Sequence, residues 1–297
     1  MKKNNSLLGL ILVALAQIMV AINIVTTKSL LPSTPALFLL TVRFTLATLI
    51  LLFLHCWSPK NKYPLLHYFS QLKRKDWLYI LAQALTAGVL FNLFMLLGLQ
   101  YTDANNAGII TSILPLMIAI MSWLILGEKI SYRTVISILL VTLGLFIISY
   151  GAFKGNTSSS LQGYLLILLS LLPEALYYIL SKLYSIPLPI FLLSALLNGI
   201  NALILGLLIP FYSFSPINWQ YNELGSLLVL GLSSGLFYVF WYYGCEHIEG
   251  MMASLSTAIM PVTTVLFAWL FLGEHFTLIQ ALGMGIIISS ILSYLKA

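Results

Sequence analysis

The sequence predicts an all-helical integral membrane protein, with ten transmembrane helices arranged as two inverted repeats of five. Composition gives the first reason, because 60% of the 297 residues are hydrophobic and only 7% are charged, whereas soluble domains carry roughly 25% charged residues. Apolar runs of membrane-spanning length recur along the whole chain. In addition, the second half of the chain repeats the first.

The predicted helices follow from length and hydrophobicity, since a transmembrane helix needs roughly 20 mostly apolar residues. The first run follows Lys2-Lys3 and resembles a signal peptide, but it continues to about Val25, so we expect an uncleaved helix. Polar or turn-forming stretches such as 32–35 and 155–158 separate the runs. The ten segments are about 6–27, 36–56, 77–99, 104–126, 132–150, 161–182, 189–212, 224–245, 250–272 and 277–296.

The internal repeat aligns residues 98–130 with residues 244–276 at a shift of 146, without a gap. The preceding helices align at a shift of 154, which pairs Gly9 with Gly163 and Lys28 with Lys182. The predicted units are therefore 6–150 and 161–296. Five helices is an odd number, so the second unit enters the membrane from the opposite side. Inverted repeats of this kind are typical of secondary transporters, whose binding site lies between the halves.

The distribution of positive charge predicts the orientation, because cytoplasmic loops carry an excess of Lys and Arg. With the N-terminus inside, Lys28 and Lys154 lie outside, and Arg43 lies within the second helix. Both termini are then cytoplasmic. The remaining positive residues all lie inside: Lys2, Lys3, Lys60, Lys62, Lys73, Arg74, Lys75, Lys129, Arg133, Lys182 and Lys296.

These features together resemble the drug/metabolite transporter superfamily, specifically its EamA-type branch with two repeats, over nearly the whole chain. The resemblance rests on the five-plus-five helices, the proline in the fourth helix of each unit, the Arg43-Phe44 pair, and the matched sequences 126–129 and 272–275. It implies an inner-membrane carrier with alternating access, usually an exporter of amino acids, other metabolites or drugs. The two repeats differ at their charged positions. The second repeat has Leu197 at the position equivalent to Arg43, and the first has Val20 at the position equivalent to Glu174, so any polar site is asymmetric.

Glu174 is the sharpest candidate for a binding residue. An acidic side chain near a helix centre costs about 2.5–3.5 kcal/mol on insertion scales, a cost that a cavity or a partner must offset. Tyr177, Tyr178 and Ser181 follow at i+3, i+4 and i+7, so they share its helix face. We interpret Glu174 as a substrate-amine or proton site. A structural ion pair or a protonated packing residue is an equally weighted alternative.

Arg43 is the second candidate, since its guanidinium suits a carboxylate or another anion. The alternative, an arginine that fixes the second helix by snorkelling or by pairing with carbonyl groups, is favoured. The resemblance implies that family members with many different substrates have an arginine at this position, so Arg43 by itself does not explain selectivity for one substrate.

Several uncharged side chains extend the predicted substrate site. Asn23, Gln83 and Thr86 lie on helices that the resemblance places around the central cavity, although interhelical hydrogen bonding also explains them. Tyr238 and Trp241 predict an aromatic wall against a substrate, or else belong to the aromatic belt at the membrane interface.

The fourth helix of each repeat contains a proline, Pro115 or Pro261, which we predict to be a gating hinge or a packing element. Thr111 and Thr257 precede these prolines at matched positions. They are expected to bind substrate or to satisfy carbonyl groups that the prolines free.

The leading functional hypothesis is a carrier for a small organic solute, with amino acids or related compounds as substrates and proton coupling through Glu174 as a sub-hypothesis. No cofactor, metal or nucleic acid is predicted. An intramembrane enzyme is the rival, but the chain has neither H-E-x-x-H nor G-x-S-x-G, and its four histidines lie away from helix centres. A non-transporting membrane scaffold is the third hypothesis.

Overall fold

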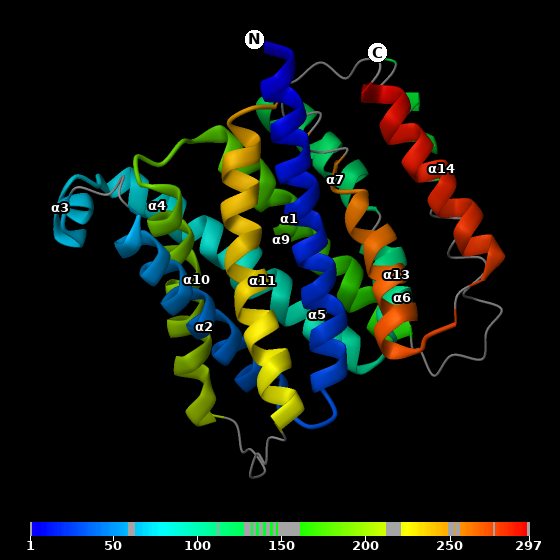
Figure 1. Ribbon diagram of the computed structural model, residues 1–297, viewed down its shortest axis with the longest axis horizontal. Coiled ribbons are helices and arrows are strands. Elements are labelled where there is room, and N and C mark those ends of the chain that lie inside the picture. The colour runs from blue at the N-terminus through cyan, green and yellow to red at the C-terminus, as the bar shows by residue number, and fades with distance from the viewer. Residues whose placement is uncertain are drawn as a thin grey trace.

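The computed structural model describes residues 2–58, 63–111, 113–127, 161–211, 221–248, 256–275 and 277–295, together with Ala253 and short pieces between 132 and 147. All regular structure within these ranges is helical (Figure 1). Helix α1 spans Lys2–Leu30 and α2 spans Ala36–Trp57. The remaining described elements are α3 (Leu65–Ser70), α4 (Arg74–Gln83), the π-helix η1 (Ala84–Leu90), α5 (Phe91–Gln100), α6 (Ala104–Thr111), α7 (Leu114–Met121), the π-helix η2 (Ser122–Leu126), α9 (Leu161–Leu183), α10 (Ile190–Leu208), the 3-10 turn η3 (Ile209–Phe211), α11 (Tyr221–Cys245), α13 (Ile259–Leu272) and α14 (Leu278–Leu295).

Six described helical segments are long and apolar enough to cross a membrane: Leu7–Leu30, Ala36–Trp57, Arg74–Gln100, Leu161–Leu183, Ile190–Leu208 and Glu223–Cys245. Shorter apolar helices cover Leu114–Leu126 and Ile259–Leu272. Most of the predicted helix at 132–150 lies outside the described residues. The structure thus confirms an all-helical protein with several apolar helices of spanning length, and the count of ten stays a prediction.

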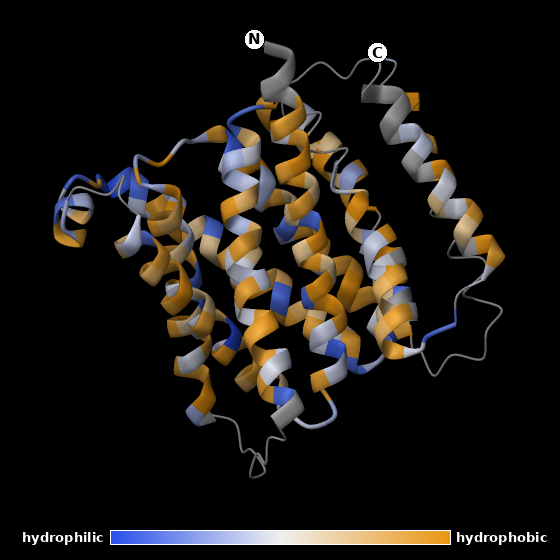
Figure 2. Cartoon of the chain, viewed as in Figure 1, coloured by the Kyte–Doolittle hydropathy of each residue, from blue (hydrophilic) through white to orange (hydrophobic). Residues whose placement is uncertain are grey.

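Hydrophobic positions predominate along the helices (Figure 2), and many of their large side chains are exposed. On α10, for example, Leu203 is 68% exposed and Leu207 is 71% exposed. A helical surface of this kind matches a lipid environment, in which the helix itself satisfies the backbone hydrogen bonds. Hydrophilic positions interrupt the apolar helices at mid-height, inside the bundle.

The predicted helix at 104–126 is interrupted, because α6 ends at Thr111 and α7 begins at Leu114. Pro115 occupies the first turn of α7, where its missing N–H breaks no helical hydrogen bond. Pro261 likewise lies in the first turn of α13, which follows a turn at Thr257 and Ala258. The two prolines therefore begin new helical segments instead of kinking a continuous helix.

Hydrogen bonds between distant segments define the two ends of the bundle. At the end where α1 finishes, called here the Leu30 end, Lys28 meets Thr102 and Asn106 meets Tyr164, near the start of α9. At the opposite end, called here the Tyr184 end, Tyr184 follows α9 and meets Asp76 at the start of α4. Helix α9 consequently begins where α1 ends, so the corresponding helices of the two halves run in opposite directions.

Two matched glycine pairs set the closest helix crossings. A Cβ atom at Gly244 would lie 3.0 Å from the backbone oxygen of Gly9, and one at Gly98 would lie 3.1 Å from that of Gly163. The first pair brings α11 against α1, and the second brings α5 against α9. These are the glycines that the two repeat shifts align, so each half of the chain packs against the other through the same kind of contact. Small residues permit this close approach in membrane helices.

Candidate functional site

Two small adjoining cavities, of about 30 and 20 Å³, lie at the centre of the bundle. Both are lined by Asn23 of α1, Arg43 of α2 and Asn92 of α5, and Glu174 of α9 lines the larger one. A cavity of this size holds one or a few water molecules. The structure is therefore closed around a polar centre to which both halves contribute. The other residues that line the larger cavity are Val20, Phe44, Ala87, Phe91, Ser234, Phe237 and Tyr238.

Arg43 is held by a short chain of hydrogen bonds that starts at the π-helix η1. Its Nη2 donates to Oδ1 of Asn92 at 2.5 Å. Nδ2 of Asn92 donates to the backbone oxygens of Ala87 and Gly88, each at 2.7 Å. A π-helix displaces backbone carbonyl groups from the ordinary α-helical pattern, and such segments are frequent at functional sites. Asn92 thus caps η1 and, through its other amide atom, orients the guanidinium.

The guanidinium of Arg43 also lies over the ring of Phe44, 4.5 Å from the ring centroid, and the whole side chain is only 5% exposed. The expectation that Arg43 snorkels to the membrane surface is therefore wrong. No carboxylate of the described residues lies within 4.0 Å of it, so burial of its charge rests on Asn92 and on the aromatic ring.

Glu174 lies on the face of α9 that points into the bundle and is 2% exposed. Its carboxylate interacts electrostatically with the hydroxyl of Tyr178, one turn further along α9. That hydroxyl accepts a hydrogen bond of 3.1 Å from Nε2 of Gln17 on α1. Although Pro173 immediately precedes Glu174, α9 runs without a break from Leu161 to Leu183.

Three polar atoms around the larger cavity have no hydrogen-bond partner among the described residues: Oδ1 of Asn23, Nε of Arg43 and Oε2 of Glu174. They come from three helices, with α1 and α2 in the first half of the chain and α9 in the second. Leaving such groups unsatisfied in a buried place typically costs about 1–3 kcal/mol each. A site that keeps an acid, an arginine and an amide acceptor in this state is suited to bind a polar solute.

Aromatic rings close the site on the side of α9 and α11. Tyr177 meets Tyr238 edge to face, with ring centroids 5.8 Å apart, and Tyr178 packs on Trp241 at 4.3 Å. Nε1 of Trp241 donates a hydrogen bond of 3.1 Å to Oγ of Ser181. Tyr238 and Trp241, each 2% exposed, therefore lie in the interior of the bundle and not in an aromatic belt at its surface.

The other predicted site residues lie apart from the central cavities. Gln83 accepts a short hydrogen bond from the hydroxyl of Tyr242, nearer the Tyr184 end. The hydroxyl of Thr86 donates to the backbone oxygen of Ala82 at 2.8 Å, and that of Thr111 donates to Gly108 at 2.7 Å. Thr257 is fully buried at the turn before α13. None of these side chains, nor Pro115 or Pro261, belongs to the described lining of the two cavities.

Asn201 of α10 is fully buried, and both of its amide atoms lack a hydrogen-bond partner among the described residues. Its side chain lies directly against Gly88 of η1, so closely that a Cβ atom at Gly88 would overlap the amide. Ser194, Asn198 and Asn201 recur at helical spacing on α10, and this pattern could have indicated that Asn201 lies on a polar face inside the bundle.

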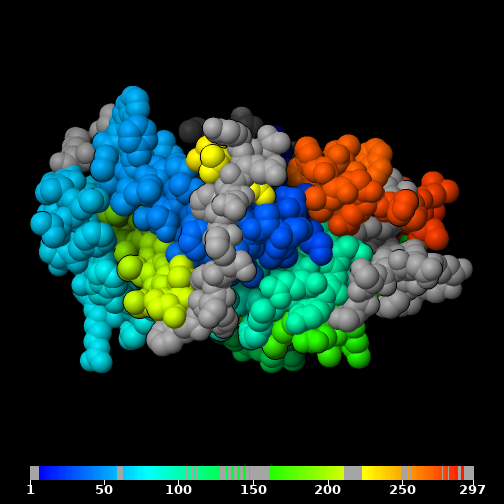
Figure 3. All heavy atoms as spheres, turned by 90° about the horizontal axis from the view of Figure 1, so that it is seen from below, coloured from blue at the N-terminus to red at the C-terminus, as the bar shows by residue number. Residues whose placement is uncertain are grey.

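Figure 3 views the bundle from the Leu30 end, where polar contacts join α1 to the end of α5 and join the two halves of the chain. Lys28 donates from Nζ to the backbone oxygens of Leu99 at 2.8 Å and Thr102 at 2.6 Å. The backbone N–H of Ala104 donates to Oε1 of Glu274 at 3.1 Å. Glu128, the repeat counterpart of Glu274, lies outside the described residues.

A second polar contact closes the Tyr184 end. The hydroxyl of Tyr184 donates a hydrogen bond of 2.6 Å to Oδ1 of Asp76. Its ring stacks on Tyr79 with centroids 4.5 Å apart, and the ammonium of Lys75 lies 4.8 Å from its ring centroid. This contact joins the first turn of α4 to the segment that follows α9, so it again links the two halves.

The family comparison matches both halves of the chain, since the EamA-like transporter family covers residues 7–150 and 161–295. The chain belongs to the EamA-like transporter family. The central polar site between α1, α2, α5, α9 and α11 is thus the interior of a membrane transporter of this family. The sequence resemblance to the EamA-type branch is confirmed.

Relatives and solved structures agree with this membership of the EamA-like family. The uncharacterized transporter YetK of Bacillus subtilis is 29% identical over 94% of this chain and 84% of its own length. An uncharacterized transporter of Archaeoglobus fulgidus is 30% identical over 75% of this chain and 79% of its own length. A solved protein structure matches 97% of this chain and 95% of its own with a TM-score of 0.73 at 18% identity, which supports the fold alone.

Proposed function

We propose that this protein is a secondary transporter that exports small zwitterionic metabolites, amino acids or related compounds, by alternating access. One observation carries the proposal: Glu174, Arg43 and Asn23 surround one buried cavity, and each presents a polar atom that has no partner among the described residues. The cavity lies between two halves whose corresponding helices run in opposite directions, the arrangement in which such carriers bind their substrate.

The polar atoms match the two ends of an amino acid. A carboxylate fits the guanidinium of Arg43, which presents several N–H donors in a fixed plane. An ammonium group fits the carboxylate of Glu174 and the amide oxygen of Asn23. The rings of Phe44 and Phe237 line the same cavity and provide an apolar surface for a side chain. A zwitterion would satisfy both buried charges at once, which neither a simple anion nor a simple cation does.

The transport cycle follows from the contacts at the two ends. The central cavities are too small for an organic solute in this closed structure. The carrier opens on one side when the Lys28 and Glu274 contacts at the Leu30 end separate, and on the other when the Tyr184–Asp76 contact separates. The proposed hinges are the breaks before Pro115 and Pro261, where one helical segment ends and the next begins.

The proposed orientation follows the positive charges. Lys73, Arg74, Lys75 and Lys182 all lie towards the Tyr184 end, whereas Lys28 lies at the Leu30 end. The positive-inside rule then assigns the Tyr184 end to the cytoplasm, in a bacterial-type inner membrane with both termini inside and ten helices in all. Glu174 is the proposed site of proton coupling, because an isolated acid inside a membrane bundle is typical of proton pathways.

Counterflow in proteoliposomes tests the proposal. Vesicles loaded with an unlabelled amino acid should take up the labelled compound faster than empty vesicles, because only a carrier exchanges solutes in this way. Glu174→Gln should abolish this acceleration, and Glu246→Gln, which changes an exposed acid in a loop, should retain it. A protein that accelerates exchange of no amino acid across a full panel, while correctly inserted, would contradict the proposal and favour a scaffold or another substrate class.

A further inference from the structure

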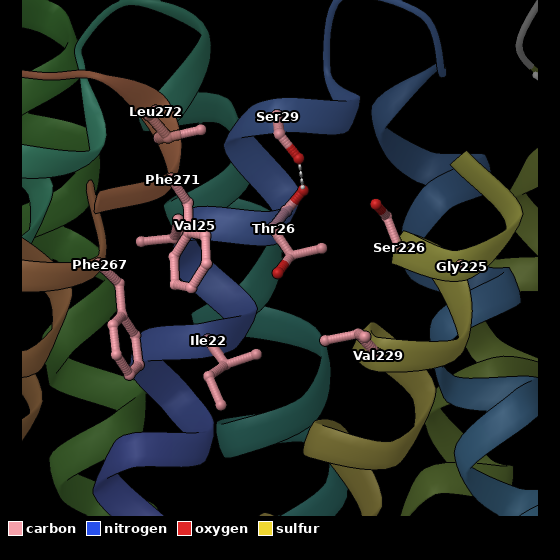
Figure 4. Close-up of a pocket in the computed structure, with 10 residues that line it drawn as sticks. All are labelled: Ile22, Val25, Thr26, Ser29, Gly225, Ser226, Val229, Phe267, Phe271 and Leu272. Atoms are coloured by element: carbon pink, nitrogen blue, oxygen red, sulfur yellow. Dashed lines mark hydrogen bonds between the residues drawn. The ribbon is translucent and has the colours of Figure 1, made fainter. Parts of the chain in front are cut away.

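A separate and larger cavity, of about 580 Å³, lies between α1, α11 and α13 near the Leu30 end. Figure 4 shows the side chains around it, with Ile22, Val25, Thr26 and Ser29 on α1. The central cavities use another face of α1, that of Val20, Asn23 and Thr27. Helix α1 therefore separates the central site from this second cavity, called here the α1–α11–α13 cavity.

The lining of this cavity is uncharged and changes in polarity along the bundle. Its hydroxyl groups, from Thr26, Ser29 and Ser226, lie towards the Leu30 end beside Phe271 and Leu272 of α13, whereas Ile22, Val229 and Phe267 line the other end (Figure 4). The volume falls in the range of about 300–1,000 Å³ that is usual for small-molecule sites. A ligand that fits this gradient has a long apolar chain and an uncharged or hydrogen-bonding group at one end.

The cavity opens on the outer surface of the bundle. Phe271 on one wall is 73% exposed, and Val229 on another is 43% exposed. The walls of the cavity are apolar helices, and two of them, α1 and α11, are long enough to cross a membrane. The surroundings of the opening are therefore lipid, and a ligand enters sideways from the bilayer without crossing water.

The corresponding place in the other half of the chain is filled. The repeat shifts align Thr26 with Leu180, Gly225 with Tyr79, and Ser226 with Ile80. Tyr79 stacks there on Tyr184, and Ile80 is fully buried. The cavity is thus not a general consequence of the repeated fold. At these three positions the half that contains the cavity has the smaller residue.

We propose that the α1–α11–α13 cavity is a binding site for one acyl chain of a membrane phospholipid, with the polar end of the lipid at Thr26, Ser29 and Ser226. The depth of the cavity, its sideways opening and its polarity gradient all match a lipid taken from the adjacent leaflet. The bound chain lies between α11 and α13 against α1, so it stabilises the position of the helix that carries Asn23.

Photolabelling in vesicles tests this site with phosphatidylcholine that carries a diazirine in its acyl chain. Mass spectrometry of the labelled protein should find at least fivefold more label on residues 22–29 and 267–272 than on Leu203 and Leu207, which face lipid on α10. Equal labelling of the two regions would overturn the proposal, since it would indicate ordinary lipid contact.

Two variants fill the cavity. Thr26→Leu with Ser226→Ile introduces the residues of the other half, and Gly225→Leu adds a side chain at a position with no atom within 4 Å of the added Cβ. Each variant that elutes as a single species should lose at least fivefold of the label at 22–29. Thr45→Leu, the same exchange on an exposed face of α2, should lose none. Retained label in the filled variants would overturn the proposal. A wild-type dimer that dissociates when the cavity is filled would also overturn it, because a second copy of the protein, and not a lipid, would then cover the cavity.

Discussion

Asn92 holds Arg43 in the centre of the bundle through a hydrogen bond of 2.5 Å between Oδ1 and Nη2. The same side chain binds the carbonyl groups of Ala87 and Gly88 in the π-helix η1. Irregular backbone inside the membrane therefore positions one of the two buried charges that face the central cavity.

Replacement of Asn92 by Ala should destabilise the protein and impair substrate binding together. It removes the partner of Arg43 and leaves the carbonyl groups of η1 unsatisfied, at a cost of about 1–3 kcal/mol per buried group. Thermal unfolding in detergent measures the first effect and counterflow the second. Gln100→Ala, which removes an exposed amide at the end of α5, is the control and should change neither quantity. Wild-type behaviour of Asn92→Ala would show that η1 and Arg43 hold their positions independently.

The glycine crossings predict opposite effects for the same substitution. Gly98→Ala and Gly244→Ala place a Cβ atom about 3 Å from a backbone oxygen of the facing helix, so both should lower the melting temperature. Gly225→Ala, in a helix with open space around it, should raise the melting temperature or leave it unchanged, because Ala favours a helix over Gly by about 0.8–1.0 kcal/mol. If all three variants melted alike, the close crossings would not limit stability.

Loss of the ammonium group at Lys28 should loosen the Leu30 end. In Lys28→Met the backbone oxygens of Leu99 and Thr102 lose the donor that joins them to α1. Amide hydrogen exchange in the peptide 99–107 should become at least several-fold faster, since exchange reports local opening. The peptide 190–205 of α10, far from this contact in the chain, serves as the internal control. Unchanged exchange in 99–107 would remove Lys28 from the proposed opening at that end.

The Tyr184–Asp76 hydrogen bond predicts a stability difference that depends on pH. The bond to Asp76 raises the pKa of the Tyr184 hydroxyl above its ordinary value of about 10. A raised folded-state pKa means that the protonated form is stabilised, so the contribution is complete below pH 10 and is lost as the pH rises through the folded-state pKa.

Tyr184→Phe should accordingly melt below the wild type at pH 7, and the difference should shrink at strongly alkaline pH. Tyr63→Phe, at an exposed position, should follow the wild type throughout. If Tyr184→Phe melted at the same temperature as the wild type at pH 7, the ring, and not the hydroxyl, would maintain the contact.

Much of the helical architecture was predictable from the sequence, because lipid imposes a simple rule of length and hydrophobicity. The glycines illustrate this: the repeat shifts aligned Gly9 with Gly163 and Gly98 with Gly244, and the structure places all four at helix crossings, where Gly9 meets Gly244 and Gly98 meets Gly163. Glu174 was equally visible, since an acid inside an apolar helix requires a specific explanation.

Other features left no pattern in the sequence. One additional residue in a turn creates η1, and nothing in the apolar run 84–90 distinguishes it from an α-helix. The link from Asn92 to Arg43 depends on that turn, so it could not be predicted. The α1–α11–α13 cavity depends on small residues from separate helices, and only the packing of those helices brings them together.

The most direct test of the central claim compares substrate analogues in the Glu174→Gln variant. If Glu174 binds the ammonium group and Arg43 the carboxylate, Glu174→Gln should weaken binding of an amino acid at least tenfold, as measured by isothermal titration calorimetry of the purified protein. Its effect on the matching carboxylic acid without the amine should be small, and Arg43→Gln should show the reverse pattern with the matching amine. Equal losses for the zwitterion and both trimmed analogues in each variant would contradict the account, because the two charges would then support the fold and not the substrate.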